Sequence, residues 1–162
     1  MATQSTLSVG DMAPDFSLQA DDGKTYRLSE LRGRRIVLYF YPKDSTPGCT
    51  QQACDFRDQR ERFADALILG VSPDSIASHQ KFRQKYGLNF PLLSDPGAEV
   101  AKLYGAYGEK VLYGKKTVGM IRSTFVIDES GRLAQVYRKV SVKGHIERVL
   151  SDLGGAVGSA HV

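Results

Sequence analysis

The chain has 162 residues, of which 41% are hydrophobic and 25% are charged. These proportions are ordinary for a globular protein, so they exclude a disordered chain and leave room for one domain with a sizeable core. The 22 basic and 18 acidic residues are interspersed along the whole chain. We therefore expect the net charge of +4 to form a solvated basic surface and not a nucleic-acid-binding face.

The two ends of the chain carry little sequence signal. Residues 1–9 lack the basic start and the apolar run of a signal peptide, and no segment approaches the length of a transmembrane span. We therefore expect a cytoplasmic protein that does not bind a membrane. Residues 1–153 are expected to form one domain, and the glycine-rich residues 154–162 a flexible C-terminal tail.

The first predicted elements are a hairpin, a buried strand and a helix. Thr25–Leu28 and the segment before it favour a small N-terminal hairpin. Arg35–Tyr41 is an apolar, β-branched run that predicts a buried strand. A helix should follow, because residues on one face recur at helical spacing: Ala53, Phe56, Arg60, Phe63, Ala64 and Leu67.

The later elements predict a mixed sheet. The strand at 35–41 and its helix are followed by a second buried strand, Leu67–Ser72, and a second helix, Ser75–Tyr86, and this alternation favours parallel pairing. A short strand, Leu92–Ser94, and a short helix, Ala98–Tyr104, come next. Met120–Ile127 and Leu133–Arg138 then flank a turn sequence at 128–131, which predicts an antiparallel hairpin, and Lys143–Leu153 predicts a last helix. A mixed sheet with helices on both faces is the α/β arrangement of the thioredoxin-like fold.

Both cysteines lie in the segment 42–54, where the predicted strand gives way to the helix. A free cysteine is mostly protonated at neutral pH, whereas the attacking form is the thiolate. At Cys49 the first helical turn would supply unpaired N–H groups and the positive end of the helix dipole, which stabilise a negative sulfur. Pro47 suits a helix start, Gly48 lets the backbone approach a reactant, and Thr46 could cap the turn or lend its hydroxyl to the site. This placement favours a reactive cysteine over a buried structural one.

Three positions of this segment carry a family signature. Pro42, Thr46 and Cys49 match the pattern Pro-x-x-x-Thr-x-x-Cys, so the chain resembles the peroxiredoxins. With Cys54 five positions after Cys49, it is similar to the subfamily called bacterioferritin comigratory protein or peroxiredoxin Q. The resemblance covers nearly all of the chain except its two ends and includes three further segments: 10–16, 90–95 and 121–125.

The resemblance implies a thiol-dependent peroxidase that needs no metal or organic cofactor. The thiolate of Cys49 would attack the terminal oxygen of a hydroperoxide and become a sulfenic acid. From its local sequence alone, Arg122 is expected to be an ordinary surface arginine, but it matches the family's arginine that faces the sulfur. There it would stabilise the thiolate and donate hydrogen bonds to the peroxide oxygens. By the same carry-over, Thr46 would hold the peroxide and Pro42 would shield the sulfur from water, with Gln52 as a supporting residue.

The second cysteine has two possible roles. The spacing of Cys49 and Cys54 matches neither a Cys-x-x-Cys redox pair nor a zinc site. In one intact helix their Cα atoms would be roughly 8.6 Å apart, beyond the ~7 Å that a disulfide tolerates, so a bridge requires the helix to unwind. The resemblance implies this bridge, with Cys54 resolving the sulfenic acid and thioredoxin or a similar dithiol restoring both thiols; it also implies a monomer. The alternative is a single-cysteine peroxidase that uses an external thiol and leaves Cys54 passive.

Other features support weaker hypotheses. His79, His145 and His161 have no metal-ligand spacing and none neighbours Cys49 in sequence, so we expect them to be non-catalytic, and a cysteine–histidine hydrolase has no positive sign. A copper-binding protein of similar fold would need Cys-x-x-x-Cys and a distal histidine, and the spacing here is one residue too long. Three lysines around Tyr113 are predicted to lie in a glycine-flanked loop without an assigned partner: Lys110, Lys115 and Lys116.

Overall fold

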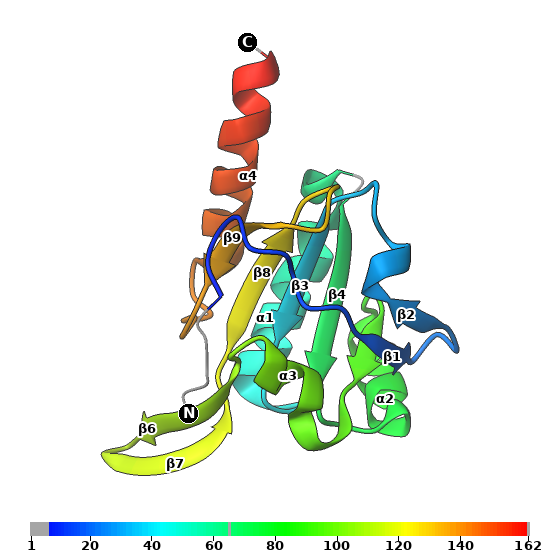
Figure 1. The fold of residues 1–162 in the computed structure, drawn as a ribbon. Helices are drawn as coiled ribbons and strands as arrows, with labels where there is room; N and C mark the ends of the chain where they lie inside the picture. The colour runs from blue at the N-terminus through cyan, green and yellow to red at the C-terminus, as the bar shows by residue number, and fades with distance from the viewer. Residues whose placement is uncertain (1–6, 65, 162) are drawn as a thin grey trace.

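A mixed sheet forms the centre of the protein (Figure 1). The computed structural model describes residues 7–64 and 66–161, and within them seven strands share this sheet. Their order across the sheet is β2 (Thr25–Arg27), β1 (Ser17–Ala20), β5 (Leu92–Ser94), β4 (Leu67–Ser72), β3 (Ile36–Phe40), β8 (Ser123–Ile127) and β9 (Leu133–Tyr137). The central strands β3, β4 and β5 are parallel, and the pairs toward both edges are antiparallel. The predicted α/β class and the thioredoxin-like mixed sheet are confirmed.

Helices cover both faces of this sheet. Helices α1 (Pro47–Asp58), α2 (Ile76–Tyr86) and α4 (His145–His161) contribute to the core cluster on one face, and α3 (Glu99–Leu103) to the cluster on the other. In Figure 1, α3 lies in front of the sheet and α1 behind it. No helix within the described residues combines the length and apolar character needed to cross a bilayer.

Local sequence explains where these elements begin and end. All five residues of β3 are buried, because alternate side chains enter the two different core clusters. Helix α2 begins where the Ser75 hydroxyl accepts the N–H of Ser78 at 3.1 Å. It ends at Gly87, whose φ of 60° is the left-handed conformation that glycine adopts without strain.

The helix predicted to continue to Leu67 is shorter than expected. Helix α1 ends at Asp58, a single 3₁₀ turn η2 (Arg60–Phe63) follows, and Leu67 belongs to β4. Ala64 adopts a φ of 57°, which reverses the chain after η2. The backbone N–H of Leu67 donates to the carbonyl of Arg35 at 2.9 Å, so Leu67 pairs in the sheet as the first residue of β4.

Two further boundaries differ from the sequence prediction. The strand predicted at 120–127 is interrupted, since Met120 ends strand β7 and Arg122 lies between β7 and β8. Helix α4 begins at His145 instead of Lys143 and runs into residues 154–161, for which the sequence predicts a tail. The flexibility of that tail stays a prediction.

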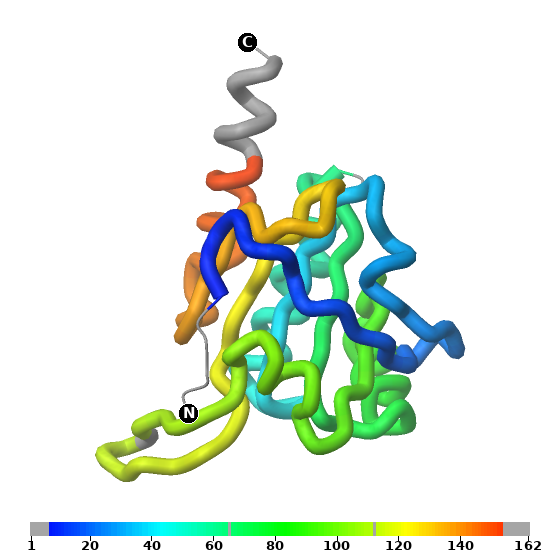
Figure 2. Tube along the Cα trace, in the orientation of Figure 1, coloured from blue at the N-terminus to red at the C-terminus, as the bar shows by residue number. Residues whose placement is uncertain are grey.

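The lysine-bearing segment forms a second sheet and not a loop. Strands β6 (Tyr107–Leu112) and β7 (Lys115–Met120) are antiparallel and project from the body as an arm (Figures 1 and 2). The loop prediction is therefore wrong, and its lysines lie in these strands: Lys110, Lys115 and Lys116. Tyr113 and Gly114 form the turn with φ of 54° and 79°, as a tight hairpin requires. Sequence patterns miss this turn because tyrosine rarely adopts a positive φ.

His145, the first residue of α4, gives the fold a pH dependence. The residue is 5% exposed, and its Nε2 lies 2.8 Å from the hydroxyl oxygen of Thr124. Burial, followed by the positive charges of Arg148 and Arg122, lowers the pKa of His145 to about 4. An unfolded chain titrates this group near pH ~6.5, so below that pH the unfolded state binds a proton that the folded state does not. Stability therefore falls as the pH falls from about 6.5 toward about 4.

We predict that His145→Gln removes this part of the pH dependence, because glutamine can keep the bond to Thr124 but does not titrate. Between about pH 7.5 and about pH 5, the wild-type protein should lose about 2 kcal/mol more unfolding free energy than the variant. Urea unfolding of both proteins at the two pH values measures the difference. Equal losses would mean that His145 is protonated in the folded protein.

Candidate active site

Cys49 lies in the first turn of α1, beneath the surface. Pro47 and Gly48 are the first two residues of the helix, and Thr46 is its N-cap. The cysteine is only 2% exposed. A thiolate at this depth loses most of its hydration, so its stability depends on the N–H groups of the first helical turn and on nearby cations.

A guanidinium supplies such a cation. Nη2 of Arg122 donates to Sγ of Cys49 at 3.3 Å, and Nη1 donates to Oε1 of the fully buried Gln52 at 2.6 Å. The antiparallel pairing of β8 with β3 sets Ser123 opposite Phe40. The residue before β8 therefore lies beside the loop that leaves β3 and enters α1. This register is how the fold brings together two residues that are 73 positions apart.

Gly48 permits the close approach of this guanidinium. A Cβ atom at this position would lie 3.2 Å from Nη2 of Arg122. A side chain here would require the guanidinium to shift by a few tenths of an ångström. The sequence analysis expected Gly48 to let the backbone approach a reactant, and in the structure the group that approaches it is the arginine.

Pro42 and Thr46 lie on the loop between β3 and α1. The hydroxyl of Thr46 donates to the carbonyl oxygen of Lys43 at 2.9 Å and makes no capping bond to α1. The proton of this hydroxyl is thus used, and its oxygen can only accept a further hydrogen bond. Pro42 lines a cleft of about 740 Å³ together with Arg122.

The cleft combines apolar walls with charged groups. The arm of β6 and β7 forms one side, and the segment after β9 another. Besides Pro42 and Arg122, these residues line it: Glu109, Lys110, Val111, Lys116, Met120, Ile121, Lys139 and Val140. A cleft of this size and character can admit a small molecule with an apolar body beside the arginine.

Tyr39 on β3 is a further buried group near the sulfur. Its ring stacks on Phe56 of α1 at 4.6 Å between centroids. Burial raises the pKa of Tyr39 well above its ordinary value, and the negative charge of Cys49 raises it further. The phenol therefore stays protonated, and Arg122 is the charged partner of the cysteine.

Cys54 does not lie against Cys49. Both thiols are free, and both belong to the unbroken helix α1. Five positions along a helix separate Cα atoms by roughly 8.6 Å, which is too far for a disulfide. The structure is therefore that of the reduced protein, and any bridge requires α1 to open.

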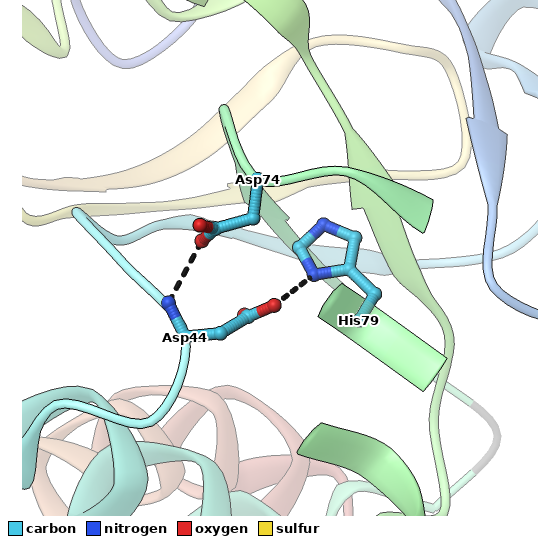
Figure 3. A group of neighbouring side chains, drawn as sticks. All are labelled: Asp44, Asp74 and His79. Carbon is cyan, nitrogen blue, oxygen red and sulfur yellow. Dashed lines mark hydrogen bonds and ion pairs between the residues drawn. The ribbon is translucent and has the colours of Figure 1, made fainter. Parts of the chain in front are cut away.

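The sequence analysis missed a histidine that contacts the active-site loop. Nδ1 of His79, on α2, lies 2.7 Å from Oδ2 of Asp44 (Figure 3). In the sequence, Asp44 lies between Pro42 and Thr46. Its position on the apolar face of a predicted helix was the available signal. Helical spacing predicts burial, but it does not say which distant loop covers the residue.

Comparisons with known proteins identify the family. The AhpC/TSA family matches residues 9–136 of the chain. The chain is 50% identical over 150 residues to Peroxiredoxin Bcp of Bacillus subtilis strain 168, an alignment that covers 91% of this chain and 96% of that protein. The chain is a peroxiredoxin of the AhpC/TSA family.

Solved structures agree with this assignment at the level of the subfamily. The Bacterioferritin Comigratory Protein of Xanthomonas campestris is 40% identical, with a TM-score of 0.83 over 93% of this chain and 97% of that one. A cysteine-to-serine variant of PrxQ from Xylella fastidiosa is 35% identical, with a TM-score of 0.86 over 94% of this chain and 99% of that one. This peroxiredoxin therefore belongs to the Bcp/PrxQ subfamily and is a hydroperoxide reductase.

We predict that Arg122→Ala, made in a Cys54→Ser background, slows the reaction of Cys49 with hydrogen peroxide roughly 10- to 100-fold, because a charged hydrogen bond contributes about 1.5–3 kcal/mol. The pH profile of Cys49 alkylation by iodoacetamide should also move to higher pH, because the thiolate loses its adjacent cation. Stopped-flow kinetics and timed alkylation measure the two effects.

Arg132→Ala is the matched control, since this exposed arginine lies at the far end of the β8–β9 hairpin. It should leave both measurements unchanged. An unshifted alkylation profile in the Arg122 variant would show that the guanidinium does not stabilise the thiolate.

Proposed function

We propose that this peroxiredoxin reduces hydrogen peroxide and organic hydroperoxides with Cys49 as its nucleophile. The observation that carries the proposal is the contact of 3.3 Å between Sγ of Cys49 and Nη2 of Arg122, at the first turn of α1. The thiolate attacks the terminal peroxide oxygen, the O–O bond breaks, and the sulfur becomes a sulfenic acid. The leaving oxygen takes up a proton and departs as water or an alcohol.

The surrounding residues fit the demands of this step. The Thr46 oxygen can accept the peroxide O–H, because its own proton is bonded to the carbonyl of Lys43. The Arg122 guanidinium can donate to the oxygens as negative charge moves onto the leaving one. Pro42, which lines the cleft beside Arg122, can shield the thiolate from water. These roles are shared between the loop, the helix start and the residue before β8.

The cleft supports organic substrates as well as hydrogen peroxide. Its apolar side chains, among them Val111, Met120 and Ile121, can contact the body of an alkyl hydroperoxide whose peroxide end meets Arg122. The Xanthomonas campestris relative is described by its alkyl peroxide reduction activity.

We assign Cys54 the role of resolving thiol. After the first half of α1 unwinds, the Cys54 thiolate attacks the sulfur of the sulfenic acid, an S–S bond forms, and hydroxide leaves and is protonated to water. A dithiol reductant of the thioredoxin class then supplies the two electrons that restore both thiols. We propose that the enzyme acts in the reducing cytoplasm, where such a dithiol pair is kept reduced between turnovers. We also propose that it is a monomer.

The contacts of α1 favour unwinding from its N-terminal end. The second half is anchored, because Phe56 stacks on Tyr39, Nη1 of Arg57 donates to the carbonyl of Tyr86 at 2.6 Å, and Asn89 donates to the carbonyl of Arg57 at 3.3 Å. In the first half, Cys49 and Ala53 pack in the core, and the polar contacts of Cys49 and Gln52 both go to the side chain of Arg122. Oxidation of the sulfur changes one of these two bonds directly.

The copper-binding alternative fits this site poorly. Besides the spacing of the cysteines, the sulfur of Cys49 lies beside a guanidinium, and a fixed positive charge opposes the binding of a metal cation.

We predict that Cys49→Ser abolishes peroxide consumption, because the serine hydroxyl is not ionised at neutral pH. Cys54→Ser should react with one equivalent of peroxide at the wild-type rate but lose recycling by thioredoxin. Stopped-flow kinetics and coupled turnover assays separate the two steps.

Intact mass spectrometry after one equivalent of peroxide tests the bridge. The wild-type protein should lose two hydrogens, whereas Cys54→Ser should retain an added oxygen. Equal turnover of Cys54→Ser with thioredoxin would favour the single-cysteine mechanism with an external thiol. Peroxide consumption by Cys49→Ser at a rate near that of the wild type would refute the nucleophile.

A further inference from the structure

The loop between β3 and α1 is fastened by a buried carboxylate. Asp44 is 5% exposed, and its side chain has three polar partners. Oδ1 accepts the Tyr41 hydroxyl at 2.6 Å, and Oδ2 accepts the Ser78 hydroxyl at 2.8 Å and faces Nδ1 of His79 at 2.7 Å. Ser78 and His79 both belong to α2, so the loop is tied to a helix that carries none of the active-site residues described above.

The contacts of His79 indicate how many protons it shares with Asp44. The histidine is fully buried, and its Nε2 lies 2.9 Å from the carbonyl oxygen of Leu93 in β5. A carbonyl only accepts hydrogen bonds, so Nε2 carries a hydrogen. The contact between Nδ1 and Oδ2 then requires one more proton between His79 and Asp44, whichever of the two atoms holds it.

The backbone around Asp44 is held as firmly as its side chain. Its N–H donates to Oδ2 of Asp74 at 2.7 Å, and the same carboxylate oxygen accepts the Ser72 hydroxyl at 2.7 Å. The next residue, Ser45, adopts a φ of 66°, a conformation that costs about 1 kcal/mol or more for a residue with a side chain. Such a conformation persists only where neighbouring contacts impose it.

The sequence neighbours of Asp44 belong to the candidate active site. The residue before Asp44, Lys43, provides the carbonyl that accepts the Thr46 hydroxyl at 2.9 Å. Pro42, which lines the cleft, precedes them. The two loop residues that would meet the peroxide therefore flank the buried carboxylate.

A metal site is the other use that such a cluster suggests. Ligand atoms of Asp44, Asp74 and His79 all lie within 4.8 Å of one another. Ligands about 2 Å from a shared cation keep apart from each other, whereas Nδ1 and Oδ2 are in direct contact at 2.7 Å. Oδ1 of Asp44 already accepts the Tyr41 hydroxyl, and Oδ2 of Asp74 accepts the Ser72 hydroxyl and the N–H of Asp44. The cluster is therefore built as a hydrogen-bonded network (Figure 3).

We propose that Asp44 and His79 form a positioning pair for peroxide reduction. The pair fastens the loop to α2 and β5, so that the Thr46 oxygen and Pro42 meet the peroxide in a fixed arrangement. It does not act on the sulfur, whose charge is stabilised by Arg122 and the start of α1. This inference rests on the proposed role of Cys49, and its experiment separates the two.

The test compares two reactions of Cys49 in a Cys54→Ser background. His79→Leu removes the bond to Asp44 and should lower the rate constant with hydrogen peroxide roughly 10- to 100-fold, as expected for a misplaced reactant. The rate of alkylation by iodoacetamide, which needs the thiolate but not Thr46, should change less than about three-fold. Asp44→Ala, which removes both carboxylate oxygens, should give the same selective loss, and the double variant should be no slower than either single one.

Two further variants separate positioning from folding. His79→Asn keeps a donor near the place of Nδ1 and should restore the peroxide rate to within a few-fold of the wild type. Arg83→Ala, on the same helix, loses bonds to Asp21 and to the carbonyl of Leu88 but does not contact the loop, so it controls for lower stability. It should leave the ratio of the two rates unchanged.

The outcomes are distinct. If both rates fall together in His79→Leu, or if its peroxide rate equals that of the wild type, the positioning role is refuted while the nucleophile stands. If the parent protein with Cys49 intact fails to react with peroxide, the proposed function itself fails.

Discussion

The contact between the Cys49 sulfur and the Arg122 guanidinium is the interaction on which the site depends. Cys49 is 2% exposed, so its sulfur has little water to stabilise a negative charge. The donor at 3.3 Å and the first-turn amides of α1 replace that water with fixed dipoles and a cation. Gly48 and the register of β3 with β8 follow from this requirement, because the first makes room for the guanidinium and the second delivers it.

The proposed chemistry places two opposed demands on α1. Attack on a peroxide requires Cys49 within the first helical turn, whereas a bridge to Cys54 requires that turn to open. The helix can meet both because its anchors are unequal. Phe56 and Arg57 anchor the second half through contacts that do not involve the sulfur, while in the first half Cys49 and Gln52 both bond to one arginine side chain, which contacts the reacting sulfur. The chemical state of the sulfur therefore bears directly on the stability of the turn that contains it.

Sequence patterns reached much of this arrangement, and their failures have physical causes. The α/β class, the parallel core strands and the helix that begins at Pro47 follow from local periodicity and from residues with a clear backbone preference. The β6–β7 arm was not predicted, because its turn places Tyr113 at a positive φ. Arg122 was assigned through the family resemblance, since no local pattern reports a contact across 73 positions. The contact between Asp44 and His79 was not predicted for the same reason. Helical spacing indicates that a histidine is buried but does not identify its partner.

The contacts that hold the loop between β3 and α1 are separate from those that hold the first turn of α1. Among the described residues, the hydrogen-bond partners of Asp44 lie outside α1: on Tyr41, on Asp74, and on Ser78 and His79 of α2. Opening the first turn of α1 therefore leaves the fastening of the loop intact. When the thiols are restored, the helix can re-form against a loop that already holds Pro42 and Lys43 in place, so only the turn and the arginine contact need to be rebuilt. A loop fastened through α1 itself would be lost and re-ordered at every turnover. In the proposed cycle, the buried pair would let one end of the site unfold while the other keeps its geometry.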